Sequence, residues 1–182
     1  MLERELLAAA CEAILAVAGE PVSEASLRKA LGPDVSAEAL AEALDLVRKR
    51  HEGSGSGLVL EKVAGGYRLA TKPELAEFVA SFLGVRAQTR LSQAALETLA
   101  IVAYRQPVTL PEINFLRGVN SAGVVRTLLE RKLIRVAGRK QVVGTPLLYR
   151  TTKEFLVLLG LGSLSELPTL EELGETGASV GS

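Results

Sequence analysis

Apolar side chains recur at helical spacing in two stretches of the chain, and both stretches end in the same way. The first stretch predicts a helix that ends before Gly19, with apolar positions at Leu6, Leu7, Ala10, Ile14 and Leu15. The second predicts a helix over residues 92–104. Each helix is followed by a proline, a valine and a hydroxyl residue, at Pro21-Val22-Ser23 and at Pro107-Val108-Thr109. The chain therefore contains a repeated motif.

The repetition continues downstream of both helices. The segment that begins at Tyr67-Arg68 and reaches Lys72 resembles the segment that begins at Tyr149-Arg150 and reaches Lys153. The two prolines are 86 positions apart (107 minus 21), and the two tyrosines are 82 apart (149 minus 67). Because the offset is nearly constant, we infer two copies of one small domain that differ by a few loop residues.

In the first copy, a short helix capped by Ser23 ends at Gly32-Pro33, and a third helix covers residues 36–50. Its apolar face is Leu40, Leu44 and Val47. A flexible glycine-serine break over residues 53–57 comes next. Two strands, 58–63 and 67–70, then flank a glycine turn and predict a β-hairpin, which a helix ending at Leu83 follows.

The second copy repeats this order. Thr109 and Glu112 fit a capping box at the start of a short helix, and a third helix follows Asn120. A hairpin pairs residues 133–136 with 147–150, and a last helix covers residues 153–159. Three helices followed by a hairpin are typical of a winged helix. We predict a mainly α chain with small β-hairpins, of the α+β class, comprising two winged-helix domains (1–86 and 87–163) and an acidic, largely disordered tail (164–182).

Composition narrows the class of protein. The chain is 48% apolar and 23% charged, as soluble globular proteins are, and no apolar run approaches the length of a membrane span. The start lacks the layout of a secretion signal, so we expect a cytoplasmic protein. Cys11 and His51 are the single cysteine and the single histidine, which leaves little to bind zinc. We expect no cofactor, a buried Cys11 and a structural His51 at the end of its helix.

Charge is unevenly distributed. Residues 1–90 hold 11 basic and 13 acidic residues, for a net charge of −2, and residues 91–163 hold 10 and 4, for a net charge of +6. The last 19 residues carry four glutamates, for a net charge of −4. A basic second copy is compatible with a polyanionic or acidic partner, or with a solvated basic face.

Residues 120–132 occupy the position of a DNA-recognition helix. Reading base edges requires long polar side chains on its exposed N-terminal half. This helix offers Ser121, Ala122, Gly123 and Val125 there, with Asn120 as the cap, and only Arg126 is well placed and long enough. Specific DNA readout is therefore disfavoured. Weak non-specific phosphate contacts remain open, through Arg117, Arg126, Arg131, Arg139 and Lys140.

No nucleophile, acid and base converge in the sequence, so we do not expect an enzyme. A winged helix that lacks base readers can still present its faces to protein partners. Residues 118–125 place small and apolar groups where base readers would stand, and such a patch suits a partner helix.

Several segments of the second copy are characteristic as a set. They are 91–109, Ile113, 117–121, 127–131, 138–140, Gly144-x-Pro146, Tyr149, 151–156 and Leu164-Ser165-Glu166-Leu167-Pro168. In these segments the chain resembles bacterial segregation and condensation protein B, and the first copy resembles it more loosely. The resemblance implies a non-enzymatic, nucleoid-associated homodimer. It implies binding to the kleisin, segregation and condensation protein A, and through it to the structural maintenance of chromosomes (SMC) ATPase, in chromosome condensation and partition during cell division.

The resemblance also implies a division of roles, with dimerisation in the first domain and kleisin binding in the second. The chain departs from the family in its glycine-serine insertion and in Ala122, where an acidic residue is common. Our candidate partner-binding residues are Arg105, Arg117, Val119, Ser121, Ala122, Val125, Arg126 and Arg139. We expect Val125→Glu to disrupt kleisin binding while sparing the dimer and the melting temperature. The alternative function is a winged-helix transcriptional regulator that binds DNA.

Overall fold

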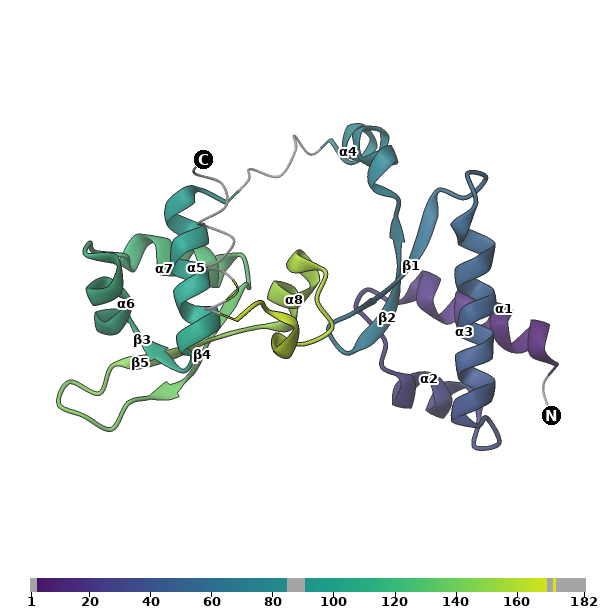
Figure 1. Ribbon diagram of the computed structural model, residues 1–182, viewed down its shortest axis with the longest axis horizontal. Coiled ribbons are helices and arrows are strands. Elements are labelled where there is room, and N and C mark those ends of the chain that lie inside the picture. The colour runs from purple at the N-terminus through teal and green to yellow at the C-terminus, as the bar shows by residue number, and fades with distance from the viewer. Residues whose placement is uncertain (1–2, 85–90, 170–171, 173–182) are drawn as a thin grey trace.

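The computed structural model describes residues 3–84, 91–169 and 172. Within these residues the fold is mainly α-helical, with one two-stranded and one three-stranded antiparallel sheet. Two separate hydrophobic cores are present, one in each repeat of the sequence. Figure 1 shows the two groups of elements side by side, the first in purple and blue and the second in teal and green. We call them the first repeat and the second repeat.

The first repeat has three helices, a hairpin and a further helix. Its elements are α1 (Arg4–Val17), α2 (Glu24–Leu31), α3 (Ala37–Glu52), β1 (Leu58–Val63), β2 (Gly66–Thr71), η1 (Pro73–Leu75) and α4 (Ala76–Leu83). The predicted apolar face of α3 is buried. Ser23 and Ser36 cap α2 and α3 by accepting hydrogen bonds from backbone amides three residues on. The local pattern thus specified these helices correctly.

The second repeat has the same order of elements, including a helix after its hairpin, and it adds a short strand before its second helix. Its elements are α5 (Gln93–Arg105), β3 (Val108–Thr109), α6 (Leu110–Arg117), α7 (Ala122–Glu130), β4 (Ile134–Arg139), β5 (Leu147–Thr151), α8 (Lys153–Leu159) and η2 (Leu164–Glu166). The capping box of Thr109 and Glu112 is confirmed. The element order of both repeats matches the winged-helix arrangement.

The repeated valine and tyrosine make equivalent contacts. Val108 pairs with Tyr149 in the three-stranded sheet, and Val22 forms an isolated antiparallel bridge with Tyr67. In the first repeat the hairpin lies so close to this bridge that a Cβ on Gly66 would stand 2.7 Å from the Val22 carbonyl. Sequence analysis missed the strand at Val108, because two residues are too few to show an alternating pattern.

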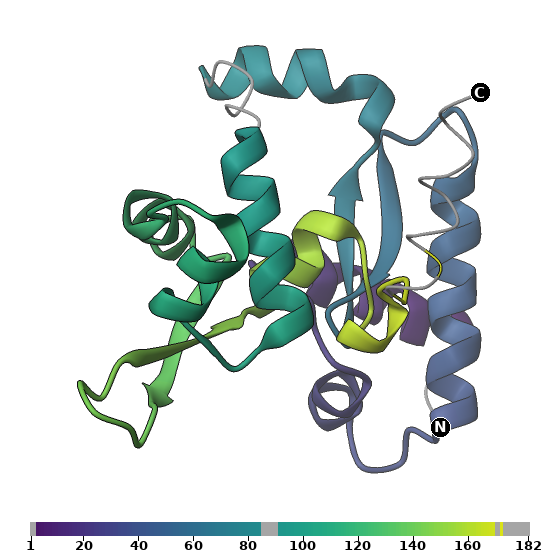
Figure 2. The ribbon, with the colours of Figure 1, turned by 60° about the vertical axis from the view of Figure 1, so that its left-hand side comes forward.

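The end of the second repeat rests on the first. The backbone amide of Ala64, in the β1–β2 turn, donates a hydrogen bond to the carbonyl of Leu161, just after α8 (2.8 Å). Figures 1 and 2 both show α8 beside the first repeat's hairpin. The chain then returns to its own core, where Leu167 packs and where the Tyr104 hydroxyl donates to the Pro168 carbonyl (2.7 Å). Most of the predicted acidic tail lies outside the described residues.

Candidate partner-binding surfaces

Helix α7 turns a different face outward from the one we expected. Val125 is 2% exposed and Ser121 is fully buried, so both side chains belong to the interior. Ser121, Val125 and Leu128 form one stripe of α7, which packs against α5 and β4. The expectation that Val125 and Ser121 line an exposed patch is therefore wrong. The helical period was clear from the sequence, but it did not say which stripe faces inward.

Arg117 is also a structural residue. Its guanidinium donates to Glu97 on α5 (3.0 Å) and to the Ser121 hydroxyl (3.3 Å), and its side chain is 11% exposed. Because these bonds hold the end of α6 against α5 and the start of α7, Arg117 is not available for a phosphate. The expectation of a partner contact there is not supported by this geometry.

The other candidates are exposed, but they lie in different places. Val119 and Ala122 flank the start of α7. Arg126 is on the outer face of α7 and forms an ion pair with Glu130 (3.0 Å). Arg139 ends β4 and donates to the Thr145 carbonyl within its own hairpin (3.1 Å). Arg105 ends α5 and lies apart from all of these, beside α6.

Arg105 borders a groove that sequence analysis missed. The groove encloses about 480 Å³ and is lined by Arg105, Pro107, Val108, Pro111, Glu112, Phe115 and Leu116. Phe115 is 86% exposed, although a large aromatic side chain is normally buried. A signal was present in the sequence, because Phe115 falls outside the helical stripe of the buried Ile113. We call this surface the α6 groove.

The two charged groups of the α6 groove are not equivalent. Glu112 accepts hydrogen bonds from Lys140 and from Thr109, which lower the pKa of its carboxyl group to about 2. The side chain of Arg105 has no hydrogen bond or ion pair within residues 3–84 and 91–169. The groove therefore offers apolar surface next to one unsatisfied cation, which suits an apolar segment that carries a carboxylate.

A second apolar surface lies on the first repeat. Helix α4 has no buried residue and makes its main contact with η1, which precedes it. Phe78 is 74% exposed, Phe82 88% and Leu83 60%. An eight-residue helix gains little stability by itself in water, so packing has to stabilise it. We call this surface the α4 face.

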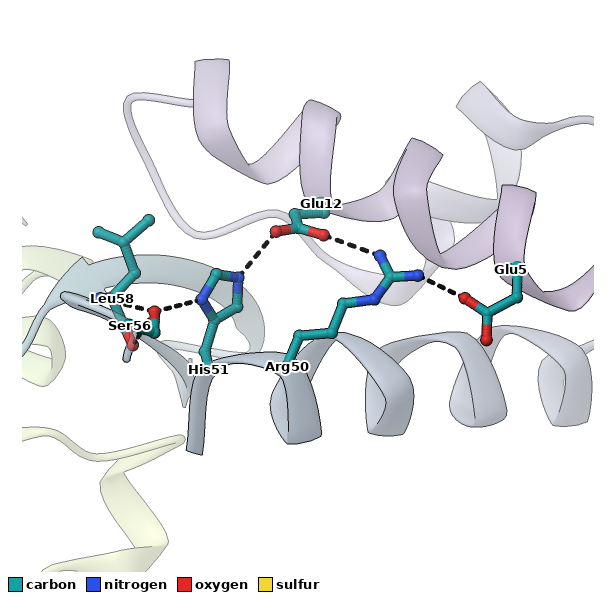
Figure 3. Close-up of polar contacts among 6 residues, drawn as sticks. All are labelled: Glu5, Glu12, Arg50, His51, Ser56 and Leu58. Atoms are coloured by element: carbon teal, nitrogen blue, oxygen red, sulfur yellow. Dashed lines mark hydrogen bonds and ion pairs between the residues drawn. The ribbon is translucent and has the colours of Figure 1, made fainter. Parts of the chain in front are cut away.

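The cluster around His51 is a structural link. Figure 3 shows His51 between Glu12 of α1, bonded through Nε2 (2.9 Å), and Ser56 of the glycine-serine loop, bonded through Nδ1 (2.7 Å). Arg50 binds Glu12 (3.0 Å) and Glu5 (2.5 Å). Partial burial of Glu12 raises the pKa of its carboxyl group. Hydrogen bonds from Arg50 and His51 together lower this pKa by more than burial raises it, so the pKa of Glu12 lies below its ordinary value. The structural role predicted for His51 thus comes from side-chain bonds rather than from the helix terminus.

The cluster also joins α1, α3 and the loop 53–57, which we predicted to be a flexible break. Lys72 donates to the Gly53 carbonyl through its Nζ (2.7 Å) and to the Gly57 carbonyl through its backbone amide (2.9 Å), so the loop is anchored at both ends.

Cys11 is fully buried as expected, and burial raises the pKa of its thiol. Among the described residues, no group of His, Cys, Asp and Glu side chains is placed to bind a metal ion, and no helix is long and apolar enough to span a membrane.

Comparison with known proteins gives consistent matches over most of the chain. The family profile "Segregation and condensation complex subunit ScpB" matches residues 9–170. Segregation and condensation protein B of Syntrophotalea carbinolica is 48% identical and covers 93% of this chain and 84% of its own. The Clostridioides difficile protein of that name is 36% identical, and the match covers 96% of this chain and 97% of the relative.

Two solved structures are similar as well. The crystal structure of ScpB from Mycobacterium tuberculosis is 38% identical, covers 88% of this chain and 99% of its own, and has a TM-score of 0.43. The crystal structure of a conserved hypothetical protein from Chlorobium tepidum is 39% identical, covers 87% of this chain and 98% of its own, and has a TM-score of 0.41.

Proposed function

The chain belongs to the segregation and condensation protein B family, and from this premise we propose that it acts as a homodimer that binds the kleisin, segregation and condensation protein A. Through the kleisin it joins the SMC ATPase in chromosome condensation and partition. As a member of this family it is a segregation and condensation subunit, and we propose a non-catalytic role. The observation that supports two partners is the presence of two apolar surfaces, one on each repeat.

We assign the α4 face to the dimer. Its exposed side chains are mainly apolar, with Glu77 as the acidic residue of the first turn. A second copy of α4 supplies the same apolar surface, and a two-fold axis brings identical surfaces together without requiring charge complementarity. Burial of Phe78 and Phe82 would remove the two largest exposed side chains of the first repeat from water.

We assign the α6 groove to the kleisin. Phe115 and Leu116 provide the apolar contact, and Arg105 provides a partner for a kleisin carboxylate. Val119 and Ala122 are exposed after the end of α6 but do not line the groove, so we do not assign them to this contact. The net charge of +6 over residues 91–163 favours an acidic kleisin segment in the same way.

Coexpression with the kleisin, followed by size-exclusion chromatography with light scattering, tests the proposal. We expect Phe115→Ser to lose the kleisin while the chain stays dimeric, and Phe78→Ser with Phe82→Ser to give a monomer. Val143→Ser is the matched control, because Val143 is fully exposed on the β4–β5 loop, outside both surfaces. Absence of a kleisin complex at micromolar concentration would contradict the proposal. A transcriptional regulator would instead discriminate DNA sequences by roughly a thousandfold or more.

A further inference from the structure

The hairpins of the two repeats carry different charge pairs at the same position: the first has an acid and a base, and the second has two bases. In the first repeat Glu61 lies opposite Arg68, and the two form an ion pair (2.7 Å). In the second repeat Arg135 lies opposite Arg150. The register makes these pairs equivalent, because each is the neighbour of the pair that contains the repeated tyrosine, Tyr67 or Tyr149. The position of an acid in one repeat is thus occupied by an arginine in the other.

Among the residues that the structure describes, the arginine pair has no counter-charge. Within residues 3–84 and 91–169, neither Arg135 nor Arg150 forms an ion pair or a side-chain hydrogen bond, and both are exposed. Like charges placed directly opposite on two strands destabilise a hairpin. The hairpin therefore bears a local cost that its equivalent in the first repeat avoids.

Two lysines extend the positive charge at the same end of the hairpin. The Thr152 hydroxyl donates to the Lys132 carbonyl (2.6 Å), which places the start of α8, and with it Lys153, next to Lys132. Both lysines are exposed, and neither has an ion pair within the described ranges. Glu154 is the nearest acidic residue in the sequence. We call the set Lys132, Arg135, Arg150 and Lys153 the hairpin cations.

The cations that the sequence favoured for phosphate contacts have other partners. Arg117 binds Glu97, Arg126 binds Glu130 and Lys140 binds Glu112. Arg139 donates to a carbonyl of its own hairpin. The hairpin cations are therefore better placed to bind an external anion.

We propose that the hairpin cations bind the phosphate backbone of double-stranded DNA without sequence selectivity. A protein partner would require apolar surface at the centre of the contact. Along the strands, however, three of the four residues that flank the arginines, Ile134, Tyr149 and Thr151, are buried, and Val136, 44% exposed, is the one apolar side chain exposed beside them. Duplex DNA needs only exposed cations, because counterion release supplies the binding free energy. Figure 1 shows the loop end of the β4–β5 hairpin extending beyond helices α5–α7, whereas the hairpin cations lie at its other end, where β5 leads into α8. The proposal is independent of kleisin binding and concerns the chain alone.

Fluorescence anisotropy of the full chain with short duplexes of two unrelated sequences tests this proposal. We expect equal affinity for both duplexes and a steep loss of affinity between about 50 and 200 mM salt. Arg135→Gln with Arg150→Gln should lower the absolute slope of log K against log salt by about 1.8, since each phosphate contact contributes about 0.9. An unchanged slope, or no binding at low salt, overturns the proposal.

The first repeat supplies the sharpest variant. Arg135→Glu places an acid opposite Arg150, as Glu61 lies opposite Arg68 in the first repeat. It should therefore raise the melting temperature while it weakens DNA binding. A loss of binding through misfolding would lower the melting temperature instead, and the two causes are thereby separated. Arg4→Gln with Arg48→Gln removes two exposed cations from the first repeat and is the matched control, expected to bind as the unmodified chain does.

Competition identifies the class of anion. A polyglutamate peptide should displace the duplex poorly at equal charge concentration, because a flexible peptide lacks the high charge density of DNA. Equal competition would overturn the proposal in favour of an acidic protein segment.

Discussion

The two repeats have separate but equivalent hydrophobic cores, and they differ in how their surface charges are partnered. In the first repeat, Glu12 binds both His51 and Arg50, and Glu61 binds Arg68 across the hairpin. In the second repeat, arginines at the equivalent hairpin positions and at the end of α5 have no internal partner within the described residues. Core positions thus set the topology, whereas the pairing of surface charges determines which side chains each repeat leaves available to partners.

Interior equivalence is clearest in the second helix of each repeat. Leu27 of α2 and Ile113 of α6 are both fully buried, and they are 86 positions apart (113 minus 27), the same offset as the prolines. Because the two cores share no residue, damage to one core should remain in its own repeat.

Val125→Glu should unfold the second repeat. A carboxylate without a partner in the core costs about 4 kcal/mol or more, which is most of the stability of a small domain. Urea unfolding followed by circular dichroism, with limited proteolysis, should show the second repeat digested and the first intact. Val119→Glu, at an exposed position, should change the free energy of unfolding by less than about 0.5 kcal/mol. Equal effects of both variants would show that α7 presents the face we first expected.

Ile113→Ala and Leu27→Ala should each destabilise one repeat by about 2–5 kcal/mol, because each removes a fully buried side chain. Hydrogen exchange measured by mass spectrometry should localise the loss of protection to residues 91–169 for the first variant and to residues 3–84 for the second. Loss of protection throughout the chain in either variant would show that the repeats unfold as one unit.

Acidification should separate the hairpin of the second repeat from α6. The pKa of Glu112 is lowered from 4.5 to about 2, mainly by the hydrogen bond from Lys140. A lowered pKa stabilises the fold above about pH 4.5, and this contribution is lost as the pH falls towards 2. Because both side chains are more than a third exposed, we expect less than about 1 kcal/mol.

The matched carboxyl group of the first repeat provides the control. Asp45 also has a pKa of about 2, but its partners Lys49 and Arg48 are on the same helix. Protonation of Glu112 should therefore loosen a tertiary contact, seen as lower protection factors in β4 and β5, whereas protonation of Asp45 should loosen contacts within α3 only. Glu112→Gln should remove the pH dependence of these protection factors, and a persistent dependence would contradict the assignment.

Arg126→Gln should have the smallest effect. The Arg126–Glu130 pair is on the outer face of α7 with side chains 82% and 62% exposed, so its loss should change the free energy of unfolding by less than about 0.5 kcal/mol. Thermal unfolding monitored by circular dichroism measures this change. A larger loss would mean that α7 depends on this pair for its position.

Local signals in the sequence predicted the helices and hairpins well. The capping box of Thr109 and the glycine after α8 fixed helix ends, and the repeat offset placed Tyr67 and Tyr149 correctly. Long-range contacts were not accessible in this way. The Arg117–Glu97 pair joins residues 20 positions apart, and the burial of Val125 depends on where α5 and β4 lie. The α6 groove was missed for the same reason, since Arg105 and Phe115 meet only after folding.

The hydrogen bond from Ala64 to Leu161 joins the two repeats through main-chain atoms alone. Replacing either side chain leaves both the donor and the acceptor in place, so alanine scanning does not detect this link. Most substitutions at the two positions preserve it, with proline at position 64 as the exception because proline has no amide hydrogen. Substitutions of the side chains therefore do not remove this link. The residues of the hairpins and of the α6 groove can change to suit different partners, while the hydrogen bond between the repeats is kept.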